Sequence, residues 1–271
     1  MDNLNNNTIS LYLPGIWALL RHAGSEILGD MPSLQLLLNR CDSLLENKLE
    51  SEAHLLNRLG WQADENSDVP IAALEQLAEG GASESDAYWF RADPVNLQED
   101  QNYLMMSYPS ELNLDMEETQ VLVDSINRHF TEDGWHIDAA DSKRWYLKLD
   151  NHPNIHTTAA WRAVGKDVFN LMPVGDDSSQ WHSWLMELQM LFFSHPVNEA
   201  RVAQGQAAVS GLWPWGGGEL PVLSPSSDYI LRGGSLFIQG VGRQSGCEIK
   251  ALADDMSAVL DDMPLKSEQL I

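Results

Sequence analysis

The chain has 271 residues, of which 44% are hydrophobic and ten are tryptophan, and it carries a formal net charge of −24. This composition excludes intrinsic disorder and predicts a packed core, organised as one large or two modest domains. The strong negative charge argues against nucleic acid and anionic membranes as partners, although a few arginines in a cleft can still bind an anionic ligand.

Neither the cysteines nor the first residues indicate an exported protein. Cys41 and Cys247 are far apart and outside any C-x-x-C unit, so we expect two free thiols rather than a disulfide or a metal site. Residues 1–10 have neither a basic region nor an apolar run, and no window approaches the ~18 consecutive apolar residues of a membrane span. We therefore expect a cytoplasmic protein.

The first third of the sequence has the periodicity of helices. One apolar stripe predicts a helix that contains Leu34, Leu37, Leu38, Cys41, Leu44 and Leu45. A second helix over residues 55–59 is expected to end at Gly60, and a third runs from Pro70 to Leu77. Residues 79–86 are rich in glycine, serine and glutamate, which marks a boundary. We assign residues 11–83 to a helical N-terminal part of a core.

Residues 84–180 have the pattern of a small α+β module. Short aromatic and apolar runs predict strands at 88–91, 103–106, 135–137 and 145–149. Asp115 and Glu118 form a capping-box pattern at the start of a helix, whose expected buried face consists of Val121, Leu122, Ile126 and Phe130. In the last strand, alternation predicts that Trp145, Leu147 and Leu149 face a core, and that Tyr146 and Lys148 face a wetter side.

Residues 181–247 are expected to return to the core. A helix over residues 181–192 is interrupted at Pro196, because the residue before a proline leaves helical geometry, and a short helix restarts and ends at Gly205. Residues 213–218, Trp-Pro-Trp-Gly-Gly-Gly, are expected to form a loop whose glycines allow a close backbone approach. A strand at Ser235–Gln239 is followed by a turn at Gly240–Gly242, and residues 248–271 form an acidic tail.

No residues have the spacing of a defined metal or nucleophile site. His152 and His156 lie four residues apart, but Pro153 argues against the helix that would place them on one face, so we expect loop histidines. The acidic pairs follow from an acid-rich composition, and the sequence has no G-x-S-x-G elbow and no Walker A motif. We therefore expect no catalytic residue, no metal site and no cofactor.

Several residues are candidates for contact with a ligand. Arg91 and Arg201 can each bind a phosphate with two hydrogen bonds, with an ion pair to a neighbouring acid as the alternative. His195 and Asn198 stand at a helix start, where a structural role is favoured over ligand contact. With the glycine-rich segment, the candidate ligand-binding set is Arg91, His195, Asn198, Arg201, Trp213, Trp215, Gly216 and Gly218.

These same residues carry a family resemblance. The sequence His195-Pro196-Val197-Asn198, followed by Arg201, Gly205 and Leu212–Gly218, resembles the H-P-x-N helix and I-W-x-W-G-x-G loop of archaeal-type cofactor-independent phosphoglycerate mutases. Phe90–Val95 is similar to the F-R-x-N segment of that family, with Asp93 where asparagine is usual. From Leu13 onward the chain looks like a group of bacterial proteins often labelled phosphoglycerate mutase or regulatory protein.

The resemblance implies an α/β fold, mixed α+β in detail, with degenerate alkaline-phosphatase-like core elements and the inserted α+β module. Mutases of this family bind two divalent metals through an N-terminal D-G-x-G-D-type segment and a C-terminal set of Asp and His, and a serine carries the phosphoryl group. Here residues 11–15 read Leu-Tyr-Leu-Pro-Gly, and no histidine follows His195. The metal ligands and the nucleophile are therefore not carried over to this chain.

Three hypotheses remain open. The first, favoured by the missing metal ligands, is a non-catalytic mutase-like protein that binds a phosphorylated small molecule or a protein partner in a regulatory role. The second is a phosphoglycerate mutase or related phosphoryl-transfer enzyme that uses a divalent metal, with Arg91, His195 and Arg201 facing a phosphorylated acid. The third is a structural subunit with the Trp-rich loop buried in an interface.

Overall fold

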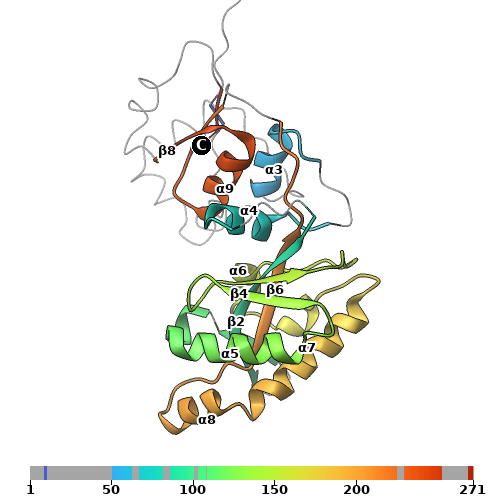
Figure 1. Cartoon of the computed structure of the whole chain (residues 1–271), viewed down its shortest axis with the longest axis vertical. Helices are drawn as coiled ribbons and strands as arrows, with labels where there is room; N and C mark the ends of the chain where they lie inside the picture. The colour runs from blue at the N-terminus through green and yellow to red at the C-terminus, as the bar shows by residue number, and fades with distance from the viewer. Residues whose placement is uncertain are drawn as a thin grey trace, which may run out of the picture.

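The structure is a computed structural model that describes residues 9–10, 51–62, 67–81, 86–100, 103–107, 109–224, 229–251 and 268–270. Within these ranges the chain has a mixed α/β fold with an upper and a lower part (Figure 1). The lower part contains an antiparallel sheet with helices on it, and the upper part contains helices and short parallel strands. The fold class expected from the sequence is confirmed.

The five-stranded sheet of the lower part is built around one long strand. Its strands are β2 (Tyr88–Asp100), β3 (Tyr103–Ser107), β4 (Trp135–Ala139), β5 (Trp145–Leu149) and β6 (Gly211–Gly218). The order is β3-β2-β5-β4, and β6 also pairs with β2, always antiparallel. The four predicted strands are confirmed, and β2 continues well beyond Arg91 because three other strands supply hydrogen bonds along its 13 residues.

Helices α5 (Met116–His129) and α7 (Ser178–Phe193) cover one face of this sheet, and α8 (Pro196–Ala203) packs against α5. A core rich in aromatic side chains joins these layers, with Trp135 stacked on Phe130 at a centroid distance of 4.6 Å. The predicted capping box of α5 is confirmed, since Asp115 and Glu118 each accept a hydrogen bond from the other's backbone N–H. The expected place of Val121 in the buried face is wrong, because Val121 is exposed and Val123 faces the core.

The upper part contains α3 (Ser51–Arg58), α4 (Ile71–Ala78) and α9 (Leu236–Ser245). Beside them, a parallel sheet has the order β1 (Ile9–Ser10), β9 (Glu268–Leu270), β7 (Tyr229–Arg232) and β8 (Glu248–Lys250). The predicted helices before Gly60 and after Pro70 are confirmed as α3 and α4. None of the described helices is long and apolar enough to cross a bilayer.

Helix α4 connects the two parts, because it packs on α9 and also on the second face of the antiparallel sheet. Ala72 and Ala73 of α4 lie against Trp89 and Tyr146. Tyr146 is therefore buried, and the wetter side expected for it is wrong. Further along the same face, the short helix α6 (Ala160–Ala163) and the 3-10 turn η2 (Val168–Leu171) close the core. A second 3-10 turn, η1 (Pro109–Glu111), precedes α5.

The expected strand at Ser235–Gln239 and turn at Gly240–Gly242 are wrong, because these residues form α9. Ser235 caps the helix by accepting a hydrogen bond from the Ile238 backbone N–H at 3.3 Å. Gly240 lies so close to α4 that a Cβ atom there would stand 2.0 Å from the Leu74 carbonyl oxygen. The glycine thus serves a close helix crossing rather than a turn.

The expected Trp-Gly loop is also wrong, because residues 211–218 form strand β6. Since β6 pairs with β2, and α7 packs on the same sheet, the sheet does not end at residue 180, where we placed the end of the inserted module. The helix break at Pro196 and the stop at Gly205, which has φ +74°, are confirmed.

Some expectations lie outside the described residues: the helix over residues 34–45, including Cys41, and residues 252–267 of the acidic tail. Of the linker 79–86, residues 82–85 are also outside. Cys247 is a free, buried cysteine, as expected for that position.

Candidate functional site

The first group of predicted residues lies at the start of α8. His195 caps this helix, its Nδ1 atom accepting a hydrogen bond from the Val197 N–H at 3.3 Å, and Pro196 follows in the first turn. The Nε2 atom of His195 lies 3.0 Å from the Ser125 hydroxyl of α5. Burial lowers the pKa of His195, which favours the neutral imidazole that both contacts accommodate. His195 therefore fastens α8 to α5.

Asn198 joins the end of α7 to the segment that leads into β6. Its amide nitrogen donates to the Phe192 and Val209 carbonyl oxygens, each at 2.8 Å. Its amide oxygen accepts from the Val209 N–H at 2.9 Å. The side chain is buried, and all three hydrogen bonds are to backbone atoms. The arrangement is that of a structural clamp.

Arg201 is completely buried and its guanidinium contacts three different segments. Nε donates to the Ala207 carbonyl oxygen at 2.9 Å, Nη1 to Oε2 of Glu118 at 2.7 Å, and Nη2 to the Leu112 carbonyl oxygen. Glu118 also closes the capping box of α5, so one carboxylate connects the start of α5 with the last turn of α8. A buried arginine with these partners presents no free edge to a phosphate.

The second group surrounds Arg91 on the other face of the sheet. Its Nε and Nη2 atoms bind Oδ1 of Asp93 at 3.1 and 2.5 Å, and Nη1 binds Oε2 of Glu75 from α4 at 2.6 Å. The guanidinium carbon lies 5.0 Å from the Trp215 ring and 5.5 Å from the Tyr146 ring. Although burial acts to lower the pKa of Arg91, the carboxylates of Asp93 and Glu75 raise it, so the arginine keeps its charge.

Trp215 belongs to the same network. Its indole Nε1 donates to Oδ2 of Asp93 at 2.8 Å, and it stands opposite Arg91 in the β2–β6 register. Asp93 thus receives hydrogen bonds from a guanidinium on one oxygen and an indole on the other. This network balances the buried charge of the guanidinium and connects the sheet with α4. Its members are Arg91, Asp93, Glu75 and Trp215.

Trp213 and the last three glycines of β6, Gly216–Gly218, also contact the protein itself. The indole Nε1 of Trp213 donates to the Thr158 carbonyl oxygen at 2.6 Å. Gly216 has φ +65°, a conformation that favours glycine, and a Cβ at Gly217 would stand 2.2 Å from the Phe90 ring. A Cβ at Gly218 would stand 2.6 Å from Pro70. The close approach predicted for these glycines is therefore to neighbouring side chains.

The structure separates the two histidines considered as metal ligands. His152 pairs with Glu219 at 2.8 Å, and His156 lies 3.5 Å from Asp68. Among the described residues, no three His, Cys, Asp or Glu side chains are arranged to hold a metal ion. The donor set of this part of the chain does not fit the two divalent metals of the mutases.

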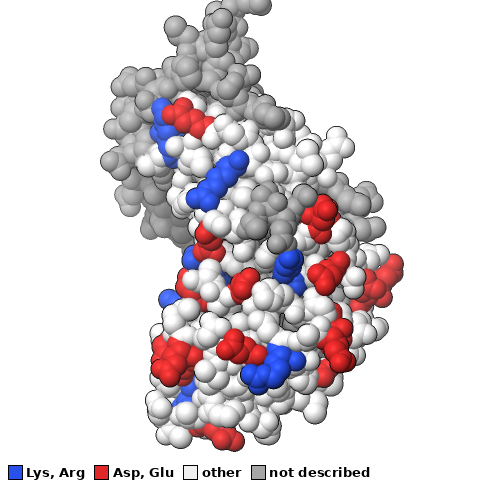
Figure 2. All heavy atoms as spheres, in the orientation of Figure 1, with Lys and Arg blue, Asp and Glu red and all other residues white. Residues whose placement is uncertain are grey.

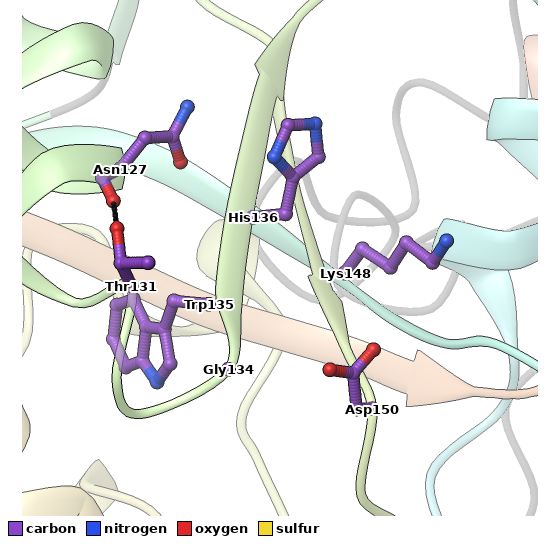
Figure 3. Close-up of a pocket in the computed structure, with 7 residues that line it drawn as sticks. All are labelled: Asn127, Thr131, Gly134, Trp135, His136, Lys148 and Asp150. Carbon is purple, nitrogen blue, oxygen red and sulfur yellow. Dashed lines mark hydrogen bonds between the residues drawn. The ribbon is translucent and has the colours of Figure 1, made fainter.

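A shallow depression of about 400 Å³ lies at the Gly134 turn, away from both groups. Figure 3 shows its lining from α5, β4 and β5, namely Asn127, Thr131, Gly134, Trp135, His136, Lys148 and Asp150. The Asn127 amide is already paired with the N–H and carbonyl of Ile137 at 2.7 and 2.9 Å. The depression thus follows the edge of β4 and holds none of the predicted ligand-binding residues.

Two acids with structural importance were missed by sequence reasoning. Glu75 completes the Arg91 network, and Asp68 accepts hydrogen bonds from the backbone and hydroxyl of Thr157 beside His156. Burial raises the pKa of Asp68. The only sequence signals were one acid just before a predicted helix and one within it, and an acid-rich chain has such acids in many places.

Comparison with known proteins gives sequence relatives of one kind. No family model matches the chain. It is 22% identical over 185 residues to the 2,3-bisphosphoglycerate-independent phosphoglycerate mutase of Methanosarcina barkeri, and 23% over 186 residues to that of Methanosarcina acetivorans. Each match covers 66% of this chain and 46% of the relative, so the chain spans about half the length of the curated relatives it matches.

Solved structures give two further similarities. The PH0037 protein from Pyrococcus horikoshii has a TM-score of 0.48 and 15% identity, covering 81% of this chain and 55% of that one. A cofactor-independent phosphoglycerate mutase from Thermoplasma acidophilum has a TM-score of 0.44 and 16% identity, covering 82% and 64%. The sequence matches establish the chain as a distant homologue of archaeal cofactor-independent phosphoglycerate mutases, which confirms the resemblance inferred from the motifs.

Proposed function

We propose that this chain is a phosphoglycerate-mutase-like protein with a binding or regulatory role and no mutase activity of its own. One observation carries the proposal. Arg91, His195 and Arg201, which a mutase-like site would turn toward a phosphorylated acid, are all occupied by partners within the protein.

Turning these side chains toward a ligand would break their hydrogen bonds and ion pairs within the protein. A phosphate that took the guanidinium of Arg201 would leave Glu118 without its ion-pair partner and two carbonyl oxygens without donors. Each buried group left without a hydrogen bond costs about 1–3 kcal/mol. A single phosphate contact does not offset that loss in a site with no open edge.

The sequence adds support of a different kind. Residues 11–15, where the resemblance places acidic metal ligands, contain no acidic side chain. We further propose a cytoplasmic location and partners other than nucleic acid or membranes, on the basis of the unpaired Cys247 and the net charge of −24.

A coupled assay for conversion of 3-phosphoglycerate to 2-phosphoglycerate tests the proposal. The purified chain is measured with manganese, magnesium and zinc in turn, beside the Methanosarcina barkeri relative as a positive control. The expected result is no turnover above the protein-free rate with any of the metals. Metal-dependent turnover that EDTA abolishes would refute the proposal and favour the enzyme hypothesis.

Thermal-shift measurement distinguishes the remaining roles. A melting temperature raised by 3-phosphoglycerate, without turnover, supports a binding protein for a phosphorylated metabolite. A melting temperature that no phosphorylated compound changes supports binding of a protein partner instead. We expect an unchanged melting temperature, because Arg91 and Arg201 are already paired with carboxylates of the protein itself.

A further inference from the structure

The outer face of α7 carries a row of apolar side chains that the described part of the chain leaves uncovered. Met186, Met190 and Phe193 are 65%, 71% and 89% exposed. Their spacing of four and three residues places them on one face of the helix. The opposite face buries Trp181, Leu185, Leu188 and Phe192 in the core. A helix that only covers a sheet presents polar residues outward. This apolar row therefore indicates a surface that contacts a partner.

The helices of the same layer carry further exposed apolar side chains. Six of the twelve large exposed hydrophobic residues in the described ranges are on α5, α7 and α8, namely Met116, Val121, Met186, Met190, Phe193 and Val202. These helices form the end of the molecule away from α3, α4 and α9 (Figure 1). Exposed apolar residues gathered on one layer are typical of an interaction surface.

The charge beside the row indicates the chemistry of the partner. Glu187 lies next to Met186 in the sequence, is half exposed and contacts His129 at 2.8 Å, and Glu199 is exposed on α8. Asp133 lies against α7, where it accepts a hydrogen bond from the Trp184 indole at 3.0 Å. The single arginine of the described α7 and α8 residues, Arg201, is buried. Acidic groups spread over the lower part in Figure 2, with fewer basic groups between them.

This charge disfavours a second copy of the chain as the occupant. Two copies would bring together surfaces from chains that each carry a net charge of −24. Like charges brought together oppose association, whereas a basic partner is attracted and oriented.

We propose that the outer face of α7 docks an amphipathic basic helix of a partner protein. The inference rests on the proposed binding role and specifies its partner. Side chains of Met186, Met190 and Phe193 form a ridge that fits between the apolar side chains of a facing helix. Lysine or arginine beside that stripe pairs with Glu187 and its acidic neighbours. The flexible methionines adapt to the shape of the facing stripe.

Binding of synthetic peptides to the full chain tests this surface. One peptide of about 18 residues contains leucine at helical spacing with lysine elsewhere, and a second has the same composition in an order without a stripe. Affinity is measured by fluorescence anisotropy for the wild type and for the triple variant Met186→Gln, Met190→Gln and Phe193→Gln. The matched control replaces Phe169, Val174 and Val222, which are 74%, 58% and 89% exposed outside these helices, by glutamine.

The striped peptide is expected to bind the wild type and the control alike, and the α7 variant at least about tenfold more weakly. All three proteins should melt at similar temperatures, because the replaced side chains are exposed. Equal affinity for the α7 variant and the control, or for the two peptides, would overturn the docking surface. Self-association of the wild type that the α7 variant abolishes would overturn it in favour of a second copy. Mutase turnover is a separate readout, so failure of the proposed function is recognised independently.

Discussion

Replacing Arg201 by methionine tests whether the motif around α8 is a structural clamp. The change keeps much of the side-chain volume and removes the guanidinium, which is completely buried. Removing one partner of a buried ion pair costs about 3–5 kcal/mol. The Glu118 side chain is 23% exposed, so water can partly solvate the carboxylate left behind. The carbonyl oxygens of Leu112 and Ala207 also lose their donor, and we expect a total near the lower end, about 3 kcal/mol.

Urea unfolding followed by tryptophan fluorescence measures this loss as a change in the free energy of unfolding. Arg201→Lys keeps the charge but cannot direct donors to three segments, so an intermediate loss is expected. Glu199→Gln, exposed on the same helix, serves as the control and should stay within about 0.5 kcal/mol of the wild type. A loss below about 1 kcal/mol for Arg201→Met would refute the clamp and return Arg201 to the ligand-binding candidates.

Other predictions concern β6 and the α8 cap. Trp213→Ala and Trp215→Ala should each lower the free energy of unfolding by about 3–5 kcal/mol, and unchanged melting of both would contradict a structural role. Gly217→Ala should destabilise by about 1–3 kcal/mol through overlap with a buried ring, whereas Gly234→Ala, with open space around it, should not. Because burial lowers the pKa of His195, the unfolded state binds more protons below about pH 6.5, and this residue makes stability rise with pH toward that value. His195→Asn, which can keep the cap, should flatten that rise in melting temperatures measured from acidic to neutral pH.

Local signals were enough to predict the helices and strands whose periodicity is strong. The capping box of Asp115 and Glu118 and the break at Pro196 are encoded within a few residues, and the structure has both. The strand expected at Ser235–Gln239 is wrong because a short apolar run does not distinguish a strand from a buried helix. The helical conformation of these residues, as α9, accompanies a close contact between Gly240 and the α4 backbone. That contact brings together residues far apart in the sequence.

The candidate site also depends on contacts between residues far apart in the sequence, which sequence patterns do not predict. The sequence indicated that Arg91 and Arg201 matter, and it left ion pairing open as the alternative to phosphate binding. Their ion-pair partners in the structure lie 16 residues away for Glu75 and 83 residues away for Glu118. No periodicity or spacing rule connects such positions, because the connection exists only once the sheet and helices are packed.

The position of these motifs in the fold shows that similarity to mutases at these residues can reflect packing alone. Asn198 and Arg201 hold α7, α5 and the approach to β6 together, and Arg91 with Trp215 holds β6 and β2 to α4. Losing any of them leaves buried polar groups unpaired, so selection for a folded protein is sufficient to retain them. Similarity at the tryptophan–glycine strand and the His-Pro helix therefore reports a shared framework, and activity has to be argued from the metal ligands themselves.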